Sequence, residues 1–395
     1  MSKVVIIGAG ASGIIAALKA SEKNEVILLE SSDKCGKKIL LTGNGKCNYW
    51  NNNININKYQ TDDINKLEDI LKNKDDVLNY LYNLGIYPKI KNDLYYPYSN
   101  QASSIEQIFL DELNKRNITI KTNYKVKEII KKEKFIIKSD MEEITSDKLI
   151  IATGSKALNK TDDTMFNILK KLNHKINPIL PSLVPLKTNK EDWNGVRCDA
   201  SVNLYINDKF IKQESGEIQL TDYGVSGICI FNISSIVSKN LYLKNKVNLK
   251  INFLPTINNI YQFIDERNKL LNNYNIEELL ESLLPYKLLF AILKQSKIKK
   301  EEYWNNLNIE QKNNLCKNIE SFELKVTDTL SYDRAQVCTG GISLKEVDIN
   351  MESKKLKDLY IIGEILDVDG ICGGYNLAFA FITGYIVGSD ICDKS

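Results

Sequence analysis

The first thirty residues constrain the fold more than any other stretch. The apolar run Lys3–Ile7 is typical of a strand buried on both faces, and it leads directly into residues 8–13, which read Gly-Ala-Gly-Ala-Ser-Gly. Residues 12–23 have the apolar spacing of a helix packed on a sheet, and Glu25–Leu29 returns as a second strand. A G-x-G-x-x-G turn between strand and helix, with Glu30 after the next strand, indicates a parallel βαβ unit that binds a dinucleotide.

Each polar or glycine position of this unit has a physical task. Gly8 permits the tight turn, Gly10 removes the Cβ that would block a pyrophosphate, and Gly13 lets helix and strand pack closely. Backbone N–H groups at the helix start, including those of Ala11 and Ser12, face the phosphates with the positive end of the helix dipole. Glu30 is the expected acceptor for the ribose hydroxyls. These positions alone leave FAD and NAD as alternatives.

Composition limits the remaining classes of protein. The 395 residues predict two or three domains, and a net charge of +3 is too mild to indicate a nucleic-acid-binding stripe. The chain enters its first strand at once and has no apolar run of about 20 residues, so we expect no signal peptide, no membrane partner and a cytoplasmic location. Eight cysteines without a C-x-x-C pair and a single histidine, His174, predict no metal site. His174, among polar neighbours, is predicted to lie on the surface.

Residues 31–51 are expected to form a long loop after the second strand. Within this loop, residues 35–48 contain three glycines, three lysines and neighbouring Thr and Asn side chains, which supply donors for an extended anionic ligand. Cys35 and Cys47 stand 12 residues apart, which does not suit a vicinal redox dithiol, so both are interpreted as structural. The cofactor-binding candidates in this loop are Lys38, Thr42, Gly43 and Asn48.

The middle of the first half predicts a small antiparallel meander and another parallel strand. Short apolar runs at residues 118–120, 124–130, 134–137 and 143–144 precede the strand at 148–152, which ends in Ala-Thr-Gly. A meander inserted before such a strand is typical of an FAD domain of the glutathione-reductase type. In such a domain this part closes over the adenosine half of FAD. The candidates here are Val126, Ala152, Thr153 and Gly154. The aromatic residues 95–98 could line a substrate cavity or simply pack.

The second half of the chain has a different pattern of apolar residues. Short strands are expected at residues 202–206, 210–213, 217–220 and 228–231, whereas residues 255–322 have helical periodicity. The predicted fold class is α/β, a Rossmann-like FAD-binding domain with an inserted β domain that itself carries a helical insertion. The predicted domains are 1–186 with 335–395 for the FAD domain, 187–254 with 323–334 for the β domain, and 255–322 for the helical insert.

The closing segment favours FAD over NAD. A last parallel strand at residues 359–362 leads into Gly363 and Glu364, and a second glycine turn at 373–374 opens a helix over 378–391. A second strand-to-helix junction suits a long ligand, with Glu364 on the ribityl hydroxyls and a helix N-terminus beside the flavin pyrimidine ring. The candidates in this segment are Gly363, Glu364, Gly374, Asn376 and Leu377.

The same motifs carry a family resemblance over nearly the whole chain. The glycine turn at 8–13, G-K-K-I-L-L-T-G-N-G-K-C-N at 36–48, T-D-Y-G-V-S-G at 221–227 and G-E-I-L-D-V-D-G-I-C-G-G-Y-N at 363–376 resemble the BaiN/YhiN flavoproteins, often described as aminoacetone oxidase-like. The resemblance implies FAD, inserted β-barrel and helical domains, and a cytoplasmic bacterial setting. It also implies two different activities, reduction of a conjugated C=C bond and oxidation of a small aminoketone. Asp222 stands where the family usually has His, and Ile228 replaces a Pro.

We therefore expect an FAD-dependent oxidoreductase that exchanges a hydride between flavin N5 and a small organic substrate. No second G-x-G-x-x-G turn is present, so NAD(P)H could act only as a transiently docked donor. An oxidase that uses O₂ is the alternative enzyme, and a flavin-carrying RNA-binding or RNA-modifying protein is the alternative class. Asn376, Tyr223 and Asp222 are the catalytic candidates, at a site where residues 44–48, 221–227 and 373–376 are predicted to converge. The sequence specifies no oligomeric state.

Overall fold

The structure is a computed structural model that describes residues 1–158, 162–189 and 191–394. The chain divides into two compact units. The first comprises Met1–Leu180 and Gln336–Ser395, and the second comprises Pro181–Ala335. The strands β12 (Ile176–Ser182) and β19 (Val337–Ile342) pair with each other, and β12 carries the chain from the first unit into the second.

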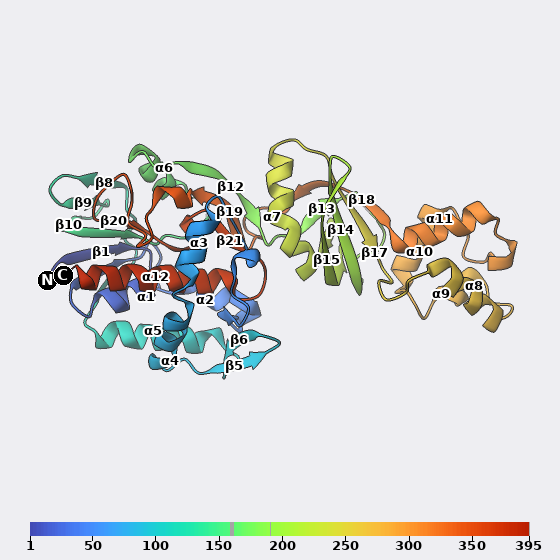
Figure 1. Ribbon diagram of the computed structural model, residues 1–395, viewed down its shortest axis with the longest axis horizontal. Helices are drawn as coiled ribbons and strands as arrows, with labels where there is room; N and C mark the ends of the chain where they lie inside the picture. Colours follow the sequence, from blue (N-terminus) through green and yellow to red (C-terminus); the bar gives the residue numbers. More distant parts are fainter. Residues whose placement is uncertain (159–161, 190, 395) are drawn as a thin grey trace. The chain divides into compact units, whose positions relative to one another are not determined.

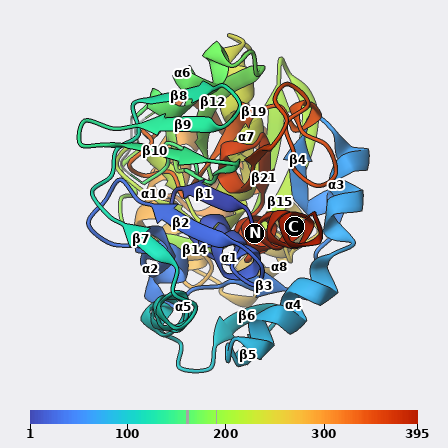
Figure 2. The ribbon, with the colours of Figure 1, turned by 90° about the vertical axis from the view of Figure 1, so that its left-hand side faces the viewer.

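A five-stranded parallel sheet forms the centre of the first unit, in the order β20-β11-β1-β2-β7 (Figures 1 and 2). Its central strands are apolar because both faces are covered; Val4, Val5 and Ile6 in β1 are fully buried. Figure 2 shows helices α1 and α5 on one side of this sheet and the three-stranded meander β8-β9-β10 on the other. The sheet strands are β1 (Lys3–Ile7), β2 (Glu25–Leu29), β7 (Thr119–Lys121), β11 (Lys148–Ile151) and β20 (Leu359–Ile361).

The first unit has further helices and short strands around this sheet. The helices are α1 (Ala11–Ala20), α2 (Lys37–Leu41), α3 (Ile64–Leu71), α4 (Lys74–Asn83), α5 (Ala102–Lys115), α6 (Thr164–Lys171) and α12 (Tyr375–Asp393). The strands are β3 (Trp50–Asn51), β4 (Tyr59–Thr61), β5 (Pro88–Lys91), β6 (Leu94–Pro97), β8 (Glu128–Lys131), β9 (Phe135–Lys138), β10 (Glu143–Ser146), β12 (Ile176–Ser182), β19 (Val337–Ile342) and β21 (Val368–Gly370).

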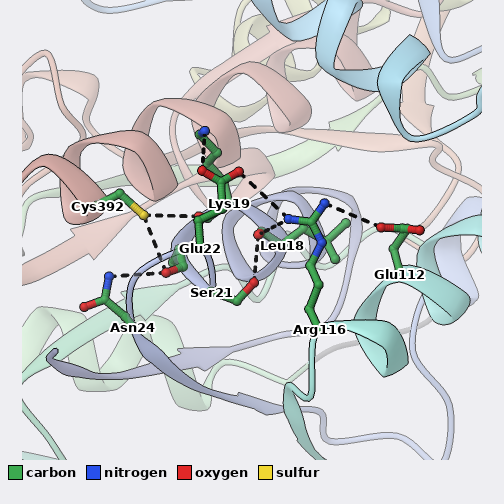
Figure 3. Close-up of polar contacts among 9 residues, drawn as sticks. Leu18, Lys19, Ser21, Glu22, Asn24, Glu112, Arg116 and Cys392 are labelled. Atoms are coloured by element: carbon green, nitrogen blue, oxygen red, sulfur yellow. Dashed lines mark hydrogen bonds and ion pairs between the residues drawn. The ribbon is translucent and has the colours of Figure 1, made fainter.

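Helices α1 and α12 pack against each other at very short range. A Cβ on Gly384 would lie 2.4 Å from the Ser12 carbonyl oxygen, so glycine is needed at this crossing. The other end of α1 is held by side chains from distant elements (Figure 3). Arg116 Nη1 donates to the Leu18 carbonyl oxygen at 2.9 Å, and Cys392 Sγ lies 3.2 Å from the Lys19 carbonyl oxygen. These contacts satisfy carbonyl groups that a helix end otherwise leaves without partners.

The second unit contains a closed six-stranded antiparallel barrel in the order β13-β16-β15-β14-β17-β18. Its helices α8 to α11 follow one another between β17 and β18, and their apolar side chains join one core with those of the barrel. The strands are β13 (Leu186–Thr188), β14 (Arg197–Ile206), β15 (Lys209–Leu220), β16 (Gly224–Ser226), β17 (Val247–Asn252) and β18 (Phe322–Thr329). The helices are α7 (Ile228–Tyr242), α8 (Ile260–Leu270), α9 (Ile276–Leu280), α10 (Tyr286–Ser296) and α11 (Ile309–Glu320).

Several local expectations are wrong. Residues 228–231 begin the helix α7, because Gly227 turns the chain at φ +111° after β16 and buried apolar residues continue at helical spacing through Ile233 and Val237. Residues 210–213 and 217–220 belong to one strand, β15, which pairs with β14 along its length. The loop expected over residues 31–51 contains α2, a 3₁₀ turn over Thr42–Gly45 and β3.

The prediction for His174 is also wrong, because the side chain is buried rather than exposed. Only 3% of its surface is accessible. Its Nε2 lies 2.7 Å from Ser353 Oγ and its Nδ1 lies 3.2 Å from the Leu169 carbonyl oxygen. Polar sequence neighbours predicted an exposed helix end, but the segment around Ser353, 179 residues away along the chain, covers the ring.

Candidate functional site

The turn between β1 and α1 brings the predicted glycines together in the first unit. Gly8 has φ +105°, and a Cβ there would lie 2.4 Å from the Ala152 carbonyl oxygen and 2.9 Å from the Thr153 Cα. A Cβ on Gly13 would lie 1.9 Å from the Gly8 carbonyl oxygen. Both positions therefore require glycine for close backbone packing, as expected.

Gly10 differs from its two neighbours because it borders open space. A Cβ at Gly10 would meet no protein atom within 4 Å, and no side chain caps the helix α1 that begins at Ala11. The first backbone N–H groups of a helix attract anions through their unpaired hydrogens and the helix dipole. The turn thus leaves room for a phosphate where the sequence predicts one.

Glu30 lies directly beside this turn. Its Oε2 accepts from the Ala9 N–H at 2.9 Å, and its Oε1 accepts from the Ser32 N–H and Oγ, each at 2.8 Å. The Tyr124 N–H donates to the Glu30 carbonyl oxygen at 2.8 Å, which places the segment with the buried Val126 next to the end of β2. A carboxylate oxygen accepts more than one hydrogen bond, so Glu30 keeps acceptor capacity for ribose hydroxyls.

Lys38, Glu364 and a serine that the sequence did not single out form a polar cluster. Ser155 Oγ donates to Glu364 Oε1 at 2.5 Å, and Lys38 Nζ donates to the Ser155 carbonyl oxygen at 3.2 Å. Lys38 Nζ lies 3.8 Å from Glu364 Oε2, and a Cβ on Gly154 would lie 3.8 Å from both groups. The Cys338 N–H also donates to Glu364 Oε1, at 3.2 Å. Ser155 directly follows the Ala-Thr-Gly run, and that position was the available signal for it.

The two strand-to-helix junctions touch each other. Gly363, with φ +73°, would place a Cβ 2.4 Å from Ser12 Oγ in α1, and its N–H donates to Thr383 Oγ1 in α12 at 3.1 Å. The start of α1 and the segment that precedes α12 are therefore neighbours. One ligand can therefore contact both junctions, as the predicted FAD would.

The loop with Thr42, Gly43 and Asn48 reaches the start of α12. With its amide oriented to satisfy both ends, Asn48 accepts from the Gly374 N–H at 3.2 Å and donates to the carbonyl oxygens of Trp50 and Tyr95. A Cβ on Gly43 would lie 3.0 Å from the Asn48 nitrogen. Thr42 Oγ1 donates to the Ile39 carbonyl oxygen at 2.6 Å and so closes α2. Gly374, at φ +86°, begins α12, and no side chain caps that helix.

The catalytic candidates lie in both units. The Asn376 side chain holds the backbone of Gly370, accepting from its N–H at 2.8 Å and donating to its carbonyl oxygen at 2.9 Å. Leu377 packs on the core of the first unit. In the second unit, Asp222 is exposed and Tyr223 is half-buried in the turn between β15 and β16. The Tyr223 carbonyl oxygen accepts from the Thr188 N–H at 3.1 Å.

The cysteines of the loop are buried thiols. Burial raises the pKa of Cys35 and of Cys47 to about 11, and the carboxylates of Glu30 and Glu106 add to the shift at Cys35. A thiol with such a pKa remains protonated at neutral pH and is a weak nucleophile. Among the residues that the structure describes, no three His, Cys, Asp or Glu side chains gather into a possible metal site. None of the described helices is long and apolar enough to cross a membrane.

The parallel sheet, the open glycine turn and the adjoining second junction define an FAD-dependent oxidoreductase of the Rossmann type. The residues present fit FAD, since Gly10 leaves space for a pyrophosphate and Glu30 stands beside it. The chain belongs to the HI0933-like family, because the family model described as "HI0933-like protein Rossmann domain" matches residues 2–390. The predicted fold class and the resemblance based on the motifs are thereby confirmed.

Relatives extend over the full chain. A 3-dehydro-bile acid delta(4,6)-reductase of Clostridium scindens is 33% identical over 413 residues, covering 100% of both proteins. A ribosomal RNA dihydrouridine synthase of Escherichia coli is 26% identical and covers 98% of this chain and 97% of that protein. Among solved structures, a 3-ketosteroid-delta4-(5alpha)-dehydrogenase from Rhodococcus jostii RHA1 has a TM-score of 0.51 at 12% identity, covering 99% of this chain and 96% of that one.

Proposed function

We propose that this protein reduces a C=C bond conjugated to a carbonyl group in a small organic substrate, with NAD(P)H as the transient electron donor. The observation that carries the proposal is the full-length match to the bile acid reductase at 33% identity. FAD, when bound, supplies a ring that takes a hydride from the donor and passes it to the substrate.

Residues of the first unit hold the cofactor in this proposal. The start of α1 and the open side of Gly10 receive the pyrophosphate, and Glu30 accepts from the ribose hydroxyls. Glu364, with Lys38 and Ser155 around it, binds the ribityl hydroxyls. The uncapped start of α12 faces the pyrimidine edge, where its dipole stabilises negative charge. Asn376 maintains that helix start by fixing the Gly370 backbone.

Reduction of such a bond also needs a proton. The hydride adds to the carbon β to the carbonyl group, and a proton must reach the α carbon to complete the product. Tyr223 is our candidate for this proton donor. Asp222 beside it is the candidate that returns a proton to Tyr223 after the reaction. The family resemblance implies a His at position 222, so an acid in its place keeps a titratable group in this turn.

A uracil ring in RNA is the second candidate substrate. The relatives named ribosomal RNA dihydrouridine synthase match nearly the whole chain at 26% identity. Formation of dihydrouridine saturates the uracil C5=C6 bond, which is conjugated to the C4 carbonyl group. Both named activities thus reduce a bond of the same electronic type. The small-molecule substrate stands first because its relative is the more similar one.

Anaerobic stopped-flow kinetics test the proposal. The bound flavin is first reduced with NADH or NADPH and then mixed with a 3-oxo-4-ene steroid, a uridine-containing RNA or O₂. Rapid reoxidation by the steroid, with saturated product, supports the first candidate, and reoxidation by RNA with formation of dihydrouridine supports the second. Reoxidation by O₂ alone would identify an oxidase and overturn both.

The proton donor has its own variant and control. Tyr223→Phe should slow reoxidation by the conjugated substrate while leaving reduction by NAD(P)H unchanged, because only reoxidation by the substrate consumes the proton. Tyr242→Phe, which removes a hydroxyl from an exposed tyrosine of the same unit, is the matched control. Equal reoxidation rates in the wild type and Tyr223→Phe would remove Tyr223 from the mechanism.

A further inference from the structure

One face of the β5–β6 hairpin carries only aromatic, basic and apolar side chains. The register pairs Lys91 with Leu94 and Lys89 with Tyr96. The Tyr98 N–H donates to the Tyr87 carbonyl oxygen at 3.0 Å and continues the same ladder. Because side chains alternate along a strand, alternate positions and their cross-strand partners share one face. That face carries Tyr87, Lys89, Lys91, Leu94, Tyr96 and Tyr98, which we call the hairpin face.

The hairpin face begins beside the start of α12. Strand β3 pairs with β6, and Asn51 Nδ2 in β3 donates to the Gly373 carbonyl oxygen at 2.9 Å. A Cβ on Gly373 would lie 3.4 Å from Leu94 Cδ2. From Leu94 to Tyr98 the strand spans four residues, or roughly 13 Å. The hairpin face therefore leads from the predicted pyrimidine edge of the flavin, near the hairpin turn, to the far end of the hairpin, where Tyr87 and Tyr98 lie.

An open cavity of about 350 Å³ lies at that far end, lined by Tyr82, Gly85, Ile86 and Tyr87. The rings of Tyr87 and Tyr98 are 6.0 Å apart, and these side chains are 72% and 66% exposed. Large aromatic groups left this exposed, beside a cavity, are suited to stack on a planar ligand ring. A Cβ at Gly85 would meet no atom within 4 Å, so the cavity floor stays open there.

The charge on this face is positive. Lys89 and Lys91 are exposed, and neither forms an ion pair with another described residue. The carboxylate of the hairpin turn, Asp93, accepts instead from the amides of Asn52 and Asn53. Two unpaired ammonium groups between an aromatic cavity and the flavin edge match a ligand with phosphates between two ring systems.

We propose that the hairpin face binds the nicotinamide dinucleotide donor, an assignment that rests on the proposed function. The adenine occupies the cavity beside Tyr87, the phosphates lie along Lys89 and Lys91, and the nicotinamide reaches the flavin near Gly373. This site explains how a chain with one G-x-G-x-x-G turn uses two dinucleotides, since the donor needs no second glycine cradle.

Stopped-flow reduction with increasing NADPH or NADH tests the site. Lys89→Ala/Lys91→Ala should raise the apparent Kd of the donor about five- to tenfold and weaken its dependence on salt, since two exposed phosphate contacts are lost. Tyr87→Ala should raise the apparent Kd as well. Lys132→Ala, at an exposed turn between β8 and β9, and Ile90→Ala, on the opposite face of β5, are controls that should match the wild type.

Direct binding separates this inference from the proposed function. NADP⁺ binding to the oxidised holoenzyme, measured by calorimetry, should weaken in the same variants even if the reduction rate is small. The same measurement is made with NAD⁺. Wild-type affinity for the dinucleotide in the lysine double variant overturns the site, and so does the absence of binding by both NAD⁺ and NADP⁺. A gel shift with single-stranded RNA that is lost in this variant while NADP⁺ affinity is retained also overturns it, in favour of RNA.

Discussion

Replacement of Gly10 by alanine separates cofactor binding from folding. The new Cβ would meet no protein atom within 4 Å, and Gly10 already has φ −86° and ψ −169°, which alanine adopts freely. Stability of the apoprotein should therefore change only by the N-cap preference, about 1 kcal/mol or less. The methyl group does enter the space that we assign to the pyrophosphate. Loss of one charge-assisted hydrogen bond there costs about 1.5–3 kcal/mol, which is about 10- to 150-fold in FAD affinity.

Gly13→Ala is the matched comparison, because the same methyl group meets the protein itself. Its Cβ would lie 1.9 Å from the Gly8 carbonyl oxygen and 3.2 Å from the Ala152 Cβ. Neither the strand end nor the helix can move without disturbing the sheet, so overpacking should cost roughly 1–3 kcal/mol or more. A helical alanine recovers at most about 1 kcal/mol of this. Gly13→Ala should thus destabilise the apoprotein, which Gly10→Ala does not.

Two measurements on the same samples decide the matter. Urea unfolding of the apoprotein gives the stability of each variant, and FAD titration by flavin fluorescence gives the affinity. We expect Gly10→Ala to keep its unfolding midpoint and lose FAD, and Gly10→Val to lose still more. Wild-type FAD affinity in Gly10→Ala would refute the position of the pyrophosphate. A midpoint as low as that of Gly13→Ala would refute the open space at Gly10.

Three further outcomes are expected. Glu30→Ala should weaken FAD binding by about 1.5–3 kcal/mol, whereas Glu25→Ala, which removes an exposed carboxylate at the start of the same strand, should not; equal titrations would contradict this. Cys35→Ser/Cys47→Ser should leave flavin reduction within a few-fold, and a collapse with FAD still bound would reveal cysteine chemistry. Burial lowers the pKa of His174 from its ordinary 6.5, so the unfolded chain binds its proton more readily. The free energy of unfolding should fall as the pH drops below about 6.5, and an identical fall in His174→Gln would show another cause.

Short-range patterns were enough to predict the cofactor-binding unit. The strand at Lys3–Ile7, the turn after it and the helix are determined by residues close together in the sequence. The requirement for glycine in the turn likewise depends on local backbone geometry. The parallel sheet and the helical run followed from apolar periodicity and glycine turns, the barrel was implied by the family resemblance, and the fold class was confirmed. The strand predicted at residues 228–231 failed because β-branched and aromatic residues also suit a buried helix over so short a window.

The tertiary structure alone decided which side chains meet. Ser155 and Glu364 are 209 residues apart in the chain, and Asn51 and Gly373 are 322 apart, yet both pairs are hydrogen-bonded. His174 is buried for the same reason, since its cover arrives from a distant segment. Local sequence determines conformation because backbone sterics and hydrophobic periodicity act over a few residues. Contacts between distant segments depend on how whole elements pack, and packing is a property of the complete core.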